Sequence, residues 1–335
     1  MRVCEKCMLN DNMPSVRIDN EGHCNYCSST ATQETRLYQN NVDEEFEALL
    51  RKTDDRKYQV IMAYSGGKDS TYTLKLIRKK YHAKVLAVTF NNGFLSESSL
   101  RNINRVTDYL GVDSLMVKYP ANKLISAFQF VEEGKVFPGT SLERASSICN
   151  LCIMLIKNMV YYEAIIREIP IICFGWTPGQ VETAKPLLKL NYRMVSKVFD
   201  NTKSAISSRF GSEYDKYFLD YEFMKVNEDR FPYLYYPFVS NAYDEKNILE
   251  EIREIGWELP ENTDGNSSNC LLNSYANQSH VERLGYHPYA FEISSMVRRG
   301  YMTREEGMKK LEKVKNDSSY DLIKAKFQNA GKLAT

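Results

Sequence analysis

Apolar and amphipathic segments alternate along the chain from residue 60 to residue 174. Short apolar runs predict strands at residues 60–63, 84–90, 114–117 and 170–174, and amphipathic stretches predict helices at residues 70–81, 96–110, 121–133 and 151–168. Strands that alternate with helices form a parallel sheet with helices on both faces. The pattern therefore predicts an α/β fold with a parallel sheet, in which ligands bind at the carboxyl ends of the strands.

Outside this region the pattern predicts mainly helices. An amphipathic stretch at residues 42–52 precedes the first strand, and a helical periodicity at residues 244–256 ends at a glycine. The chain is largely helical in pattern from residue 273, where Thr303 and Glu306 have the spacing of a capping box. The aromatic run at residues 231–238 is expected to pack against the core.

The composition is typical of a globular protein of the cytoplasm. The chain has 335 residues, of which 43% are hydrophobic and 26% are charged. We expect no membrane-spanning segment, because no apolar run approaches the roughly 20 residues that cross a bilayer and the first residues lack an apolar signal region. The formal net charge is +1, which disfavours a large nucleic acid as a partner but allows a local basic patch.

Two C-x-x-C pairs lie near the start of the chain. They consist of Cys4 and Cys7, followed after sixteen residues by Cys24 and Cys27. Four thiolates in this spacing close a tetrahedral shell around zinc, and the metal stabilises a segment that is too short to bury a core. The sequence therefore predicts a structural zinc ribbon at these cysteines.

The hexapeptide SGGKDS at residues 65–70 lies between the first predicted strand and the following helix. Its glycines let the backbone approach an oxyanion, and the helix that follows points its positive end at the same place. Lys68 adds a positive charge beside the hydroxyl groups of Ser65 and Ser70. The spacing differs from the G-x-x-x-x-G-K-[ST] loop of kinases and GTPases. It resembles the pyrophosphate-binding loop of the PP-loop ATP pyrophosphatases, which implies that ATP is cleaved between its α and β phosphates.

Two further loops follow strand ends and are expected to face the same ligand. Residues 88–93 end the second strand, and residues 174–180 follow the strand that contains Cys173. We expect Lys68 and Asp69 to be catalytic, with Mg²⁺ bound beside the ATP phosphates. The expected nucleotide-binding residues are Ala63, Tyr64, Ser65, Gly66, Gly67, Lys68, Asp69, Ser70, Thr89, Phe90, Asn91, Gly175, Trp176 and Gln180.

A second set of cysteines follows later in the chain. Cys149 and Cys152 form a C-x-x-C pair at the start of a predicted helix, and Cys270 lies far from them in the sequence. Three thiolates can hold a [4Fe–4S] cluster with one open iron, or a second zinc with a ligand of another type, and buried inert thiols are the alternative. Cys173 lies in an apolar strand and is expected to be a core residue.

Taken together, these motifs resemble the N-acetyl sugar amidotransferases of bacterial surface-polysaccharide biosynthesis. The resemblance rests on the two ribbon pairs, SGGKDS, the pair at Cys149 and Cys152, residues 174–180 and residues 300–307, and it covers nearly the whole chain. It implies an enzyme that adenylates the acetamido oxygen of a nucleotide-linked N-acetyl sugar and then substitutes ammonia for AMP. It also implies a separate glutaminase subunit that supplies the ammonia.

Two alternatives remain open. The set of Cys149, Cys152 and Cys270 is similar to the cluster site of tRNA thiolation enzymes in the same superfamily, which implies sulfur as the nucleophile. A zinc-dependent binding module that uses ATP only as a regulator is the third interpretation. We expect a zinc ribbon at residues 1–35, an ATP pyrophosphatase domain at residues 36–260 and a helical region at residues 261–335.

Overall fold

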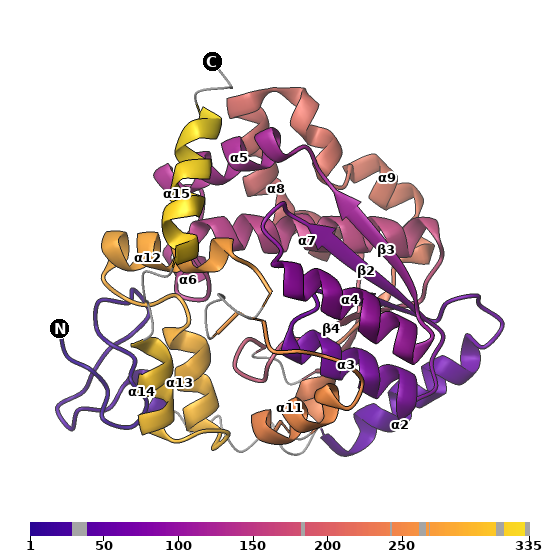
Figure 1. Cartoon of the computed structure of the whole chain (residues 1–335), viewed down its shortest axis with the longest axis horizontal. Coiled ribbons are helices and arrows are strands. Elements are labelled where there is room, and N and C mark those ends of the chain that lie inside the picture. The colour runs from indigo at the N-terminus through magenta and orange to yellow at the C-terminus, as the bar shows by residue number, and fades with distance from the viewer. Residues whose placement is uncertain are drawn as a thin grey trace.

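The computed structural model describes residues 1–28, 39–181, 185–241, 243–260, 266–267, 269–312 and 318–331. One sheet forms the centre of the protein, and helices cover both of its faces (Figure 1). The expected boundary between residues 35 and 36 lies outside the described residues, and the boundary between residues 260 and 261 lies at their edge. The division into three domains therefore stays a prediction.

The sheet has six strands in the order β3-β2-β1-β4-β6-β5. The strands are β1 (Val60–Ala63), β2 (Val85–Asn91), β3 (Asp113–Lys118), β4 (Ile171–Phe174), β5 (Leu187–Lys189) and β6 (Tyr233–Tyr235). All neighbouring pairs are parallel except β5 and β6, which are antiparallel. The predicted α/β class is confirmed, and β5 and β6 add an edge to the sheet that the sequence pattern did not predict.

The helices lie close to the predicted positions where the amphipathic pattern is strong. They are α1 (Asn25–Ser28), α2 (Gln39–Lys52), α3 (Lys68–Lys79), α4 (Glu97–Leu110), α5 (Ala121–Glu133), α6 (Gly139–Leu142), α7 (Ser147–Ile166), α8 (Tyr192–Phe210), α9 (Tyr221–Val226), α10 (Pro237–Ser240), α11 (Glu245–Arg253), α12 (Leu272–Leu284), α13 (Ala290–Arg298), α14 (Arg304–Leu311) and α15 (Ser318–Gly331). Ser96 caps α4, and the capping box of Thr303 and Glu306 at α14 is confirmed.

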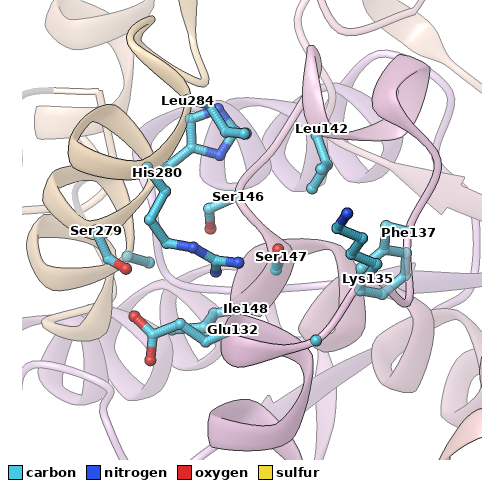
Figure 2. A pocket seen from close by; sticks show the side chains of 13 residues that line it. Glu132, Lys135, Phe137, Leu142, Ser146, Ser147, Ile148, Ser279, His280 and Leu284 are labelled. Atoms are coloured by element: carbon cyan, nitrogen blue, oxygen red, sulfur yellow. The ribbon is translucent and has the colours of Figure 1, made fainter.

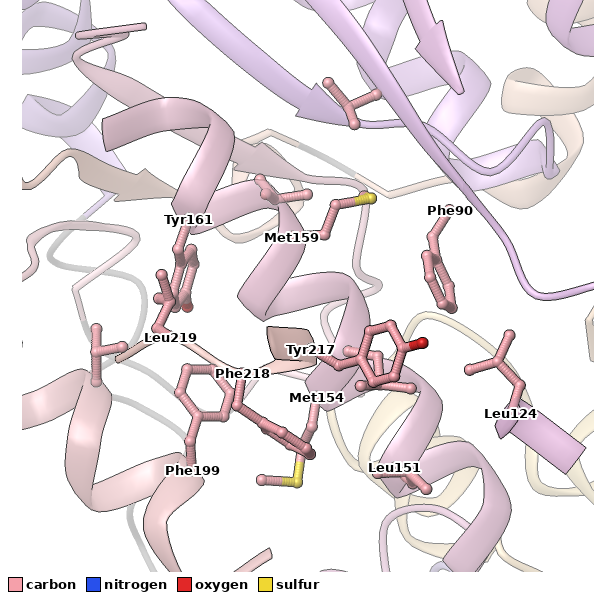
Figure 3. Close-up of a cluster of buried hydrophobic side chains, with 14 of the residues drawn as sticks. Phe90, Leu124, Leu151, Met154, Met159, Tyr161, Phe199, Tyr217, Phe218 and Leu219 are labelled. Carbon is pink, nitrogen blue, oxygen red and sulfur yellow. The ribbon is translucent and has the colours of Figure 1, made fainter. Parts of the chain in front are cut away.

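The side chains of the strands alternate between two buried clusters. Ile61 and Ile172 point to the face covered by α5, α7 and α8, where Phe90, Met159 and Phe199 also lie (Figure 3). Met62 and Cys173 point to the opposite face, which α2, α3, α4 and α11 cover. Because both faces are buried, the strands read as continuous apolar runs in the sequence.

Helix α7 has the length and composition of a helix that crosses a membrane, with 20 residues and a mean hydropathy of 1.3. The expectation that no segment approaches this length is therefore wrong for α7. Half of that stretch is buried inside the protein, and α7 packs against β1, β2 and β4. Burial against the sheet explains its apolar composition, as in the core helices of α/β proteins.

The aromatic run at residues 231–238 packs against the core, as predicted. Phe231, Tyr235 and Phe238 are each at most 2% exposed. Part of this run is β6, which pairs with β4. The run therefore extends the sheet as well as filling the core.

Candidate active site and cysteine clusters

A cavity of about 280 Å³ lies at the carboxyl ends of β1, β2 and β4. Register places Ala63 beside both Val88 and Phe174, so the loops after these three strands begin at the same edge of the sheet. Of the residues predicted from the sequence, the cavity is lined by Ala63, Tyr64, Ser65, Gly67, Lys68, Asp69, Ser70, Phe90, Cys149, Cys152, Gly175, Trp176, Gln180 and Cys270. The structure therefore brings together the glycine loop, both strand-end loops and the second cysteine set.

Contacts at Gly66 determine the conformation of the glycine loop, and they require a glycine at this position. Gly66 has a φ of +74°, and a Cβ added there would lie 2.7 Å from the carbonyl oxygen of Ser99. Trp257 Nε1 donates a hydrogen bond to the Gly66 carbonyl oxygen at 2.9 Å. Gly67 is the N-cap of α3 and provides no side-chain cap. The first turn of α3 therefore receives no side-chain cap from its N-cap residue, and its positive end lies at the cavity.

Lys68 is the positive charge of this loop. Its ammonium group lies 2.9 Å from the Asp69 carboxylate, 3.0 Å from the Tyr243 hydroxyl and 3.3 Å from the Glu245 carboxylate. Burial is the largest single effect and lowers the pKa of Lys68, but Asp69, Tyr243 and Glu245 together outweigh it and raise the pKa well above its ordinary value. Lys68 is therefore a fixed cation at the cavity wall, and no local pattern in the sequence indicated Tyr243 or Glu245 as its partners.

The loop at residues 174–180 touches the glycine loop directly. A Cβ added at Gly175 would lie 2.6 Å from Ser70 Cα, so only glycine allows this approach. Thr177 donates a hydrogen bond to the carboxylate of Glu292 in α13 at 2.8 Å, and Gln180 Oε1 accepts one from the Thr177 N–H. Burial raises the pKa of Glu292 to about 7. Glu292 fixes this loop from a helix more than a hundred residues away, and sequence reasoning missed it.

Trp176 presents an aromatic wall to the cavity. Tyr236 stacks against it with ring centroids 5.5 Å apart, and the Lys157 ammonium lies 4.8 Å from its ring centroid. Burial lowers the pKa of Lys157 to about 8. A flat aromatic surface beside a cation suits a planar, anionic ligand.

Three of the predicted nucleotide-binding residues do not line the cavity. Gly66 shapes the glycine loop from behind, and Thr89 donates a hydrogen bond to the Tyr64 carbonyl oxygen at 2.7 Å. Asn91 accepts a hydrogen bond from the Gly93 N–H at 2.9 Å. The next residue, Asn92, lines the cavity instead. It lies within the strand-end loop that the sequence pattern identified, but side-chain direction at this turn could not be read from the sequence.

The second cysteine set lines the same cavity as the glycine loop. The amide nitrogen of Asn92 lies 3.6 Å from Cys152 Sγ and 3.5 Å from Cys270 Sγ, and the amide nitrogen of Asn273 lies 3.7 Å from Cys149 Sγ. Each of the three sulfurs therefore has an amide donor. Donors of this kind stabilise negative charge on sulfur and are typical of thiolates that bind metal clusters.

Backbone pairing explains how Cys270 reaches this cavity. Cys270 forms an antiparallel bridge with Leu95, directly after the β2 loop. The Ser96 N–H donates to the Asn269 carbonyl oxygen at 3.1 Å, and the Leu271 N–H donates to the Phe94 carbonyl oxygen at 2.9 Å. These bonds hold a distant segment against the end of β2. Cys173, by contrast, is fully buried in β4, as expected of a core residue.

The N-terminal cysteines form a separate cluster. The sulfur atoms of Cys4, Cys7, Cys24 and Cys27 lie within 4.8 Å of one another. Cys4 Sγ is 3.8 Å from Cys27 Sγ, which is about the 3.8 Å edge of a tetrahedron whose zinc–sulfur bonds are about 2.3 Å. The hydrogen bond with Cys24, together with the charge of Arg298, lowers the pKa of Cys7 to about 4. The four thiols fit one metal ion, as the spacing predicts.

The sulfur atoms of Cys149, Cys152 and Cys270 do not all lie within 4.8 Å of one another. Among the described residues, only the N-terminal cysteines bring their ligand atoms within 4.8 Å of one another as a metal-binding group. A single ion shared by Cys149, Cys152 and Cys270 would need closer sulfurs. A [4Fe–4S] cluster holds its cysteine sulfurs further apart, because each one binds a different iron. In this structure the three sulfurs of the second set are therefore not arranged closely around a single ion.

Comparison with known proteins gives distant similarities. No protein-family model matches the chain. An uncharacterized protein of Methanocaldococcus jannaschii is 24% identical over 264 residues, which are 79% of this chain and 76% of that protein. A U34-tRNA thiolase of Methanococcus maripaludis, solved with its [4Fe–4S] cluster, is 16% identical, with a TM-score of 0.37 over 95% of this chain and 90% of that chain. An NH3-dependent NAD synthetase of Campylobacter jejuni is 12% identical, with a TM-score of 0.31 over 67% of this chain and 98% of that chain. Because both TM-scores are below 0.5, function has to be argued from the residues of this chain.

Proposed function

We propose that the protein is an ATP-dependent adenylating enzyme of the PP-loop ATP pyrophosphatase type. One observation carries the proposal: a single cavity at the carboxyl ends of the strands is lined by the SGGKDS loop, the amino-terminal end of α3 and the aromatic loop at residues 174–180. These are the parts that bind a pyrophosphate group and a nucleotide base in one place. The proposed substrates are ATP with Mg²⁺ and an acceptor with a carbonyl-type oxygen.

In the proposed reaction, the acceptor oxygen attacks the α-phosphorus of ATP and pyrophosphate leaves. The N–H groups that open α3 and the ammonium group of Lys68 would stabilise the negative charge that accumulates on the departing phosphates. Asp69 supplies the carboxylate of this loop and would hold Mg²⁺ beside the phosphates.

For the second half of the reaction, we propose that ammonia displaces AMP from an adenylated N-acetyl sugar. The support is the resemblance of the motifs to the N-acetyl sugar amidotransferases. In this step nitrogen bonds to the activated carbon, the bond from that carbon to the AMP oxygen breaks, and an acetamidino group remains. The proposed partner is a glutaminase subunit that supplies the ammonia. The proposed compartment is the cytoplasm, where the eight cysteines, none of which is in a disulfide, would stay reduced.

The position of the second cysteine set favours a second candidate, ATP-dependent sulfur transfer. Cys149, Cys152 and Cys270 line the same cavity as Lys68, and their sulfurs have amide donors from Asn92 and Asn273. These three thiolates would hold a [4Fe–4S] cluster beside the adenylation site, and the cluster would supply the sulfur that replaces AMP. The first half of the reaction would be unchanged.

One experiment tests both halves of the proposed reaction, adenylation of the acceptor and displacement of AMP. The full chain is purified without oxygen and incubated with ATP, Mg²⁺ and one of two sets: an N-acetylated sugar nucleotide with ammonia, or a tRNA with sulfide. Release of AMP and pyrophosphate supports adenylation, and release of ADP and orthophosphate contradicts it. An acceptor that gains NH in place of oxygen supports the amidotransferase, whereas oxygen-to-sulfur exchange supports the second candidate.

Metal analysis of two variants separates the candidates further. Cys270→Ser removes a thiol of the cavity wall, and Cys173→Ala removes a buried thiol of β4 as the matched control. If a cluster is bound, the wild type and the control are brown with absorbance near roughly 400 nm, and Cys270→Ser is colourless or unstable in air. A colourless wild type with full activity towards ammonia would remove the second candidate.

A further inference from the structure

A second cavity, of about 270 Å³, lies outside the proposed active site. It is formed where the start of α7 meets α12 and the segment after α5, and Figure 2 shows Ser147, Ile148 and His280 around it. Nothing in the proposed adenylation reaction uses this cavity. Its volume is just below the usual range for ligand-binding pockets, roughly 300–1,000 Å³, and therefore suits a small molecule.

The amino-terminal end of α7 opens into this cavity. Ser146 is the N-cap of this 20-residue helix, and its hydroxyl oxygen accepts the N–H of Cys149. The N–H groups of Ser147 and Ile148 precede the first bond inside the helix, and no hydrogen bond among the described residues uses them. Both residues line the cavity. They present two donors and the positive end of the helix dipole to anything bound there.

His280 gives an independent indication of a ligand. Its side chain lines the cavity and is 5% exposed, and its Nε2 atom has no hydrogen-bond partner within the part of the chain that the structure describes. Burial lowers the pKa of His280 to about 4, so the ring is neutral at pH 7. A buried polar nitrogen without a partner costs free energy, and a bound molecule that reaches it would remove that cost.

The charges around the cavity favour an anion. Lys135 and Arg283 line it and are exposed towards solvent. The acidic residue of the wall, Glu132, accepts a hydrogen bond from the Tyr275 hydroxyl at 3.2 Å; burial raises its pKa, and the charge of Arg283 opposes that rise. The remaining wall is apolar, with Phe137, Leu142 and Leu284. The wall therefore combines a cationic entrance and open N–H donors with apolar side chains.

We propose that this cavity is a second ligand site, which takes a small molecule with a carboxylate or phosphate group on a short apolar body. The oxyanion binds the N–H groups of Ser147 and Ile148 and the guanidinium group of Arg283, and His280 forms a hydrogen bond to the same molecule. The site lies two residues before Cys149 on α7 and seven residues after Asn273 on α12. Its occupant therefore rests against α7, which carries Cys149 and Cys152, and against α12, which carries Asn273 and begins two residues after Cys270.

Histidine NMR provides a local test, because the chain has four histidines. The full chain is labelled at the histidine rings, and the His280 signals are assigned with His280→Gln. The probes are benzoate and phenylphosphonate, which share a ring but differ in the oxyanion, and benzyl alcohol is the neutral control. We expect one or both anions to shift the His280 signals in a saturable way, and benzyl alcohol to leave them unchanged.

Two variants separate this site from the active site. Arg283→Leu should weaken the anion response of His280 at least tenfold, whereas Arg101→Leu, an exposed arginine of α4, should leave it unchanged. Lys68→Ala should also leave it unchanged, because Lys68 lines the other cavity. The proposal is wrong if neither anion shifts His280, if benzyl alcohol acts as strongly as the anions, or if Arg283→Leu keeps the wild-type affinity. A preference for benzoate or for phenylphosphonate identifies the carboxylate or phosphate class.

Discussion

Gly175→Ala gives the sharpest test of how the two loops of the proposed active site depend on each other. An alanine Cβ at this position would lie 2.6 Å from Ser70 Cα and 2.9 Å from Ser70 N. Carbon atoms in favourable contact are about 3.5–4.0 Å apart, so the two backbones would have to separate by about 1 Å. Both contacts are to backbone, and rotation of a side chain cannot relieve them.

The size of the effect follows from where the displacement occurs. Ser70 lies in the first turn of α3, is buried, and donates a hydrogen bond from its hydroxyl to the Gly67 carbonyl oxygen at 3.0 Å. Moving it by about 1 Å would shift the N–H groups that we expect to bind the departing phosphates. A misplacement of this size near reacting groups costs roughly 100-fold in rate, or about 2.7 kcal/mol. We therefore expect Gly175→Ala to slow ATP cleavage by about two orders of magnitude.

The assay measures pyrophosphate release with ATP and Mg²⁺ at saturating acceptor, and ATP binding by tryptophan fluorescence. Both tryptophans of the chain lie at the site, since Trp176 lines the cavity and Trp257 bonds to Gly66. Gly111→Ala is the matched control. Gly111 has a φ of +59° and no atom within 4 Å of an added Cβ. It precedes β3 and therefore lies at the amino-terminal ends of the parallel strands, whereas the cavity lies at their carboxyl ends. Its substitution should cost roughly 1–2 kcal/mol of stability through backbone strain but leave the reaction intact.

One outcome would refute this reasoning. If folded Gly175→Ala releases pyrophosphate as fast as Gly111→Ala, the loop at residues 174–180 does not control the phosphate-binding geometry. Circular dichroism and the thermal midpoint of each variant confirm that folded protein is compared. If Gly175→Ala loses both ATP binding and turnover, that result supports the role of this contact equally well, because the same N–H groups are expected to bind ATP and to stabilise the departing phosphates.

Three further substitutions test the charges and metal ligands. Lys68→Ala should slow pyrophosphate release by roughly 30- to 900-fold, or about 2–4 kcal/mol, because it removes the positive charge nearest the departing phosphates; an unchanged rate would contradict that role. Cys24→Ser should lower the zinc content, measured by plasma emission, by about one ion per chain, since three thiolates do not complete the shell; a full zinc content would contradict the ribbon. Glu292→Gln should flatten the dependence of the thermal midpoint on pH between about 4.5 and 7. The pKa of Glu292 is raised to about 7, so its contribution to stability is present below pH 4.5 and is lost as the pH rises through 7; a parallel profile for both proteins would argue against this.

The parts of the fold with local causes could be predicted from the sequence. β1 has the predicted bounds, and β4 differs from its predicted range by one residue, because apolar runs of this kind are buried on both faces. The glycine loop, the ribbon cysteines and the capping box of α14 are also local patterns, in which a few neighbouring residues determine the geometry. The position of Cys149 and Cys152 at the start of α7 is also determined by neighbouring residues and could be predicted in the same way.

Features that depend on distant pairing could not be predicted. β5 and β6 have three residues each, and they depend on pairing, of β6 with β4 and of β5 with β6, so their own sequence patterns are weak. Cys270 reaches the cavity only because its backbone pairs with Leu95. Tyr243 and Glu292 are ordinary tyrosine and glutamate residues in the sequence, and their contacts with Lys68 and Thr177 come from packing alone.

The N-terminal ribbon contacts α13 as well as Glu143, which accepts hydrogen bonds from Ser15. The ring of Tyr26 meets Phe291 of α13 edge-on, with centroids 5.1 Å apart. Arg298, near the end of the same helix, donates a hydrogen bond to Cys7 Sγ at 3.6 Å and lies over the ring of Tyr26. Figure 1 shows the N-terminal segment beside α13 and α14. A metal ion that orders the four thiolates would therefore also fix one side of α13.

The other side of α13 holds the loop at residues 174–180. Glu292 accepts the hydrogen bond from Thr177, and a Cβ at Gly179 would lie 2.4 Å from the Glu292 carbonyl oxygen. Because Gly175 of this loop rests against Ser70, contacts run without interruption from the ribbon cysteines to the start of α3. A rigid helix between two contacts transmits a displacement of one to the other. The ribbon is thus part of the framework that positions the phosphate-binding end of the proposed active site, although its thiols lie outside the cavity.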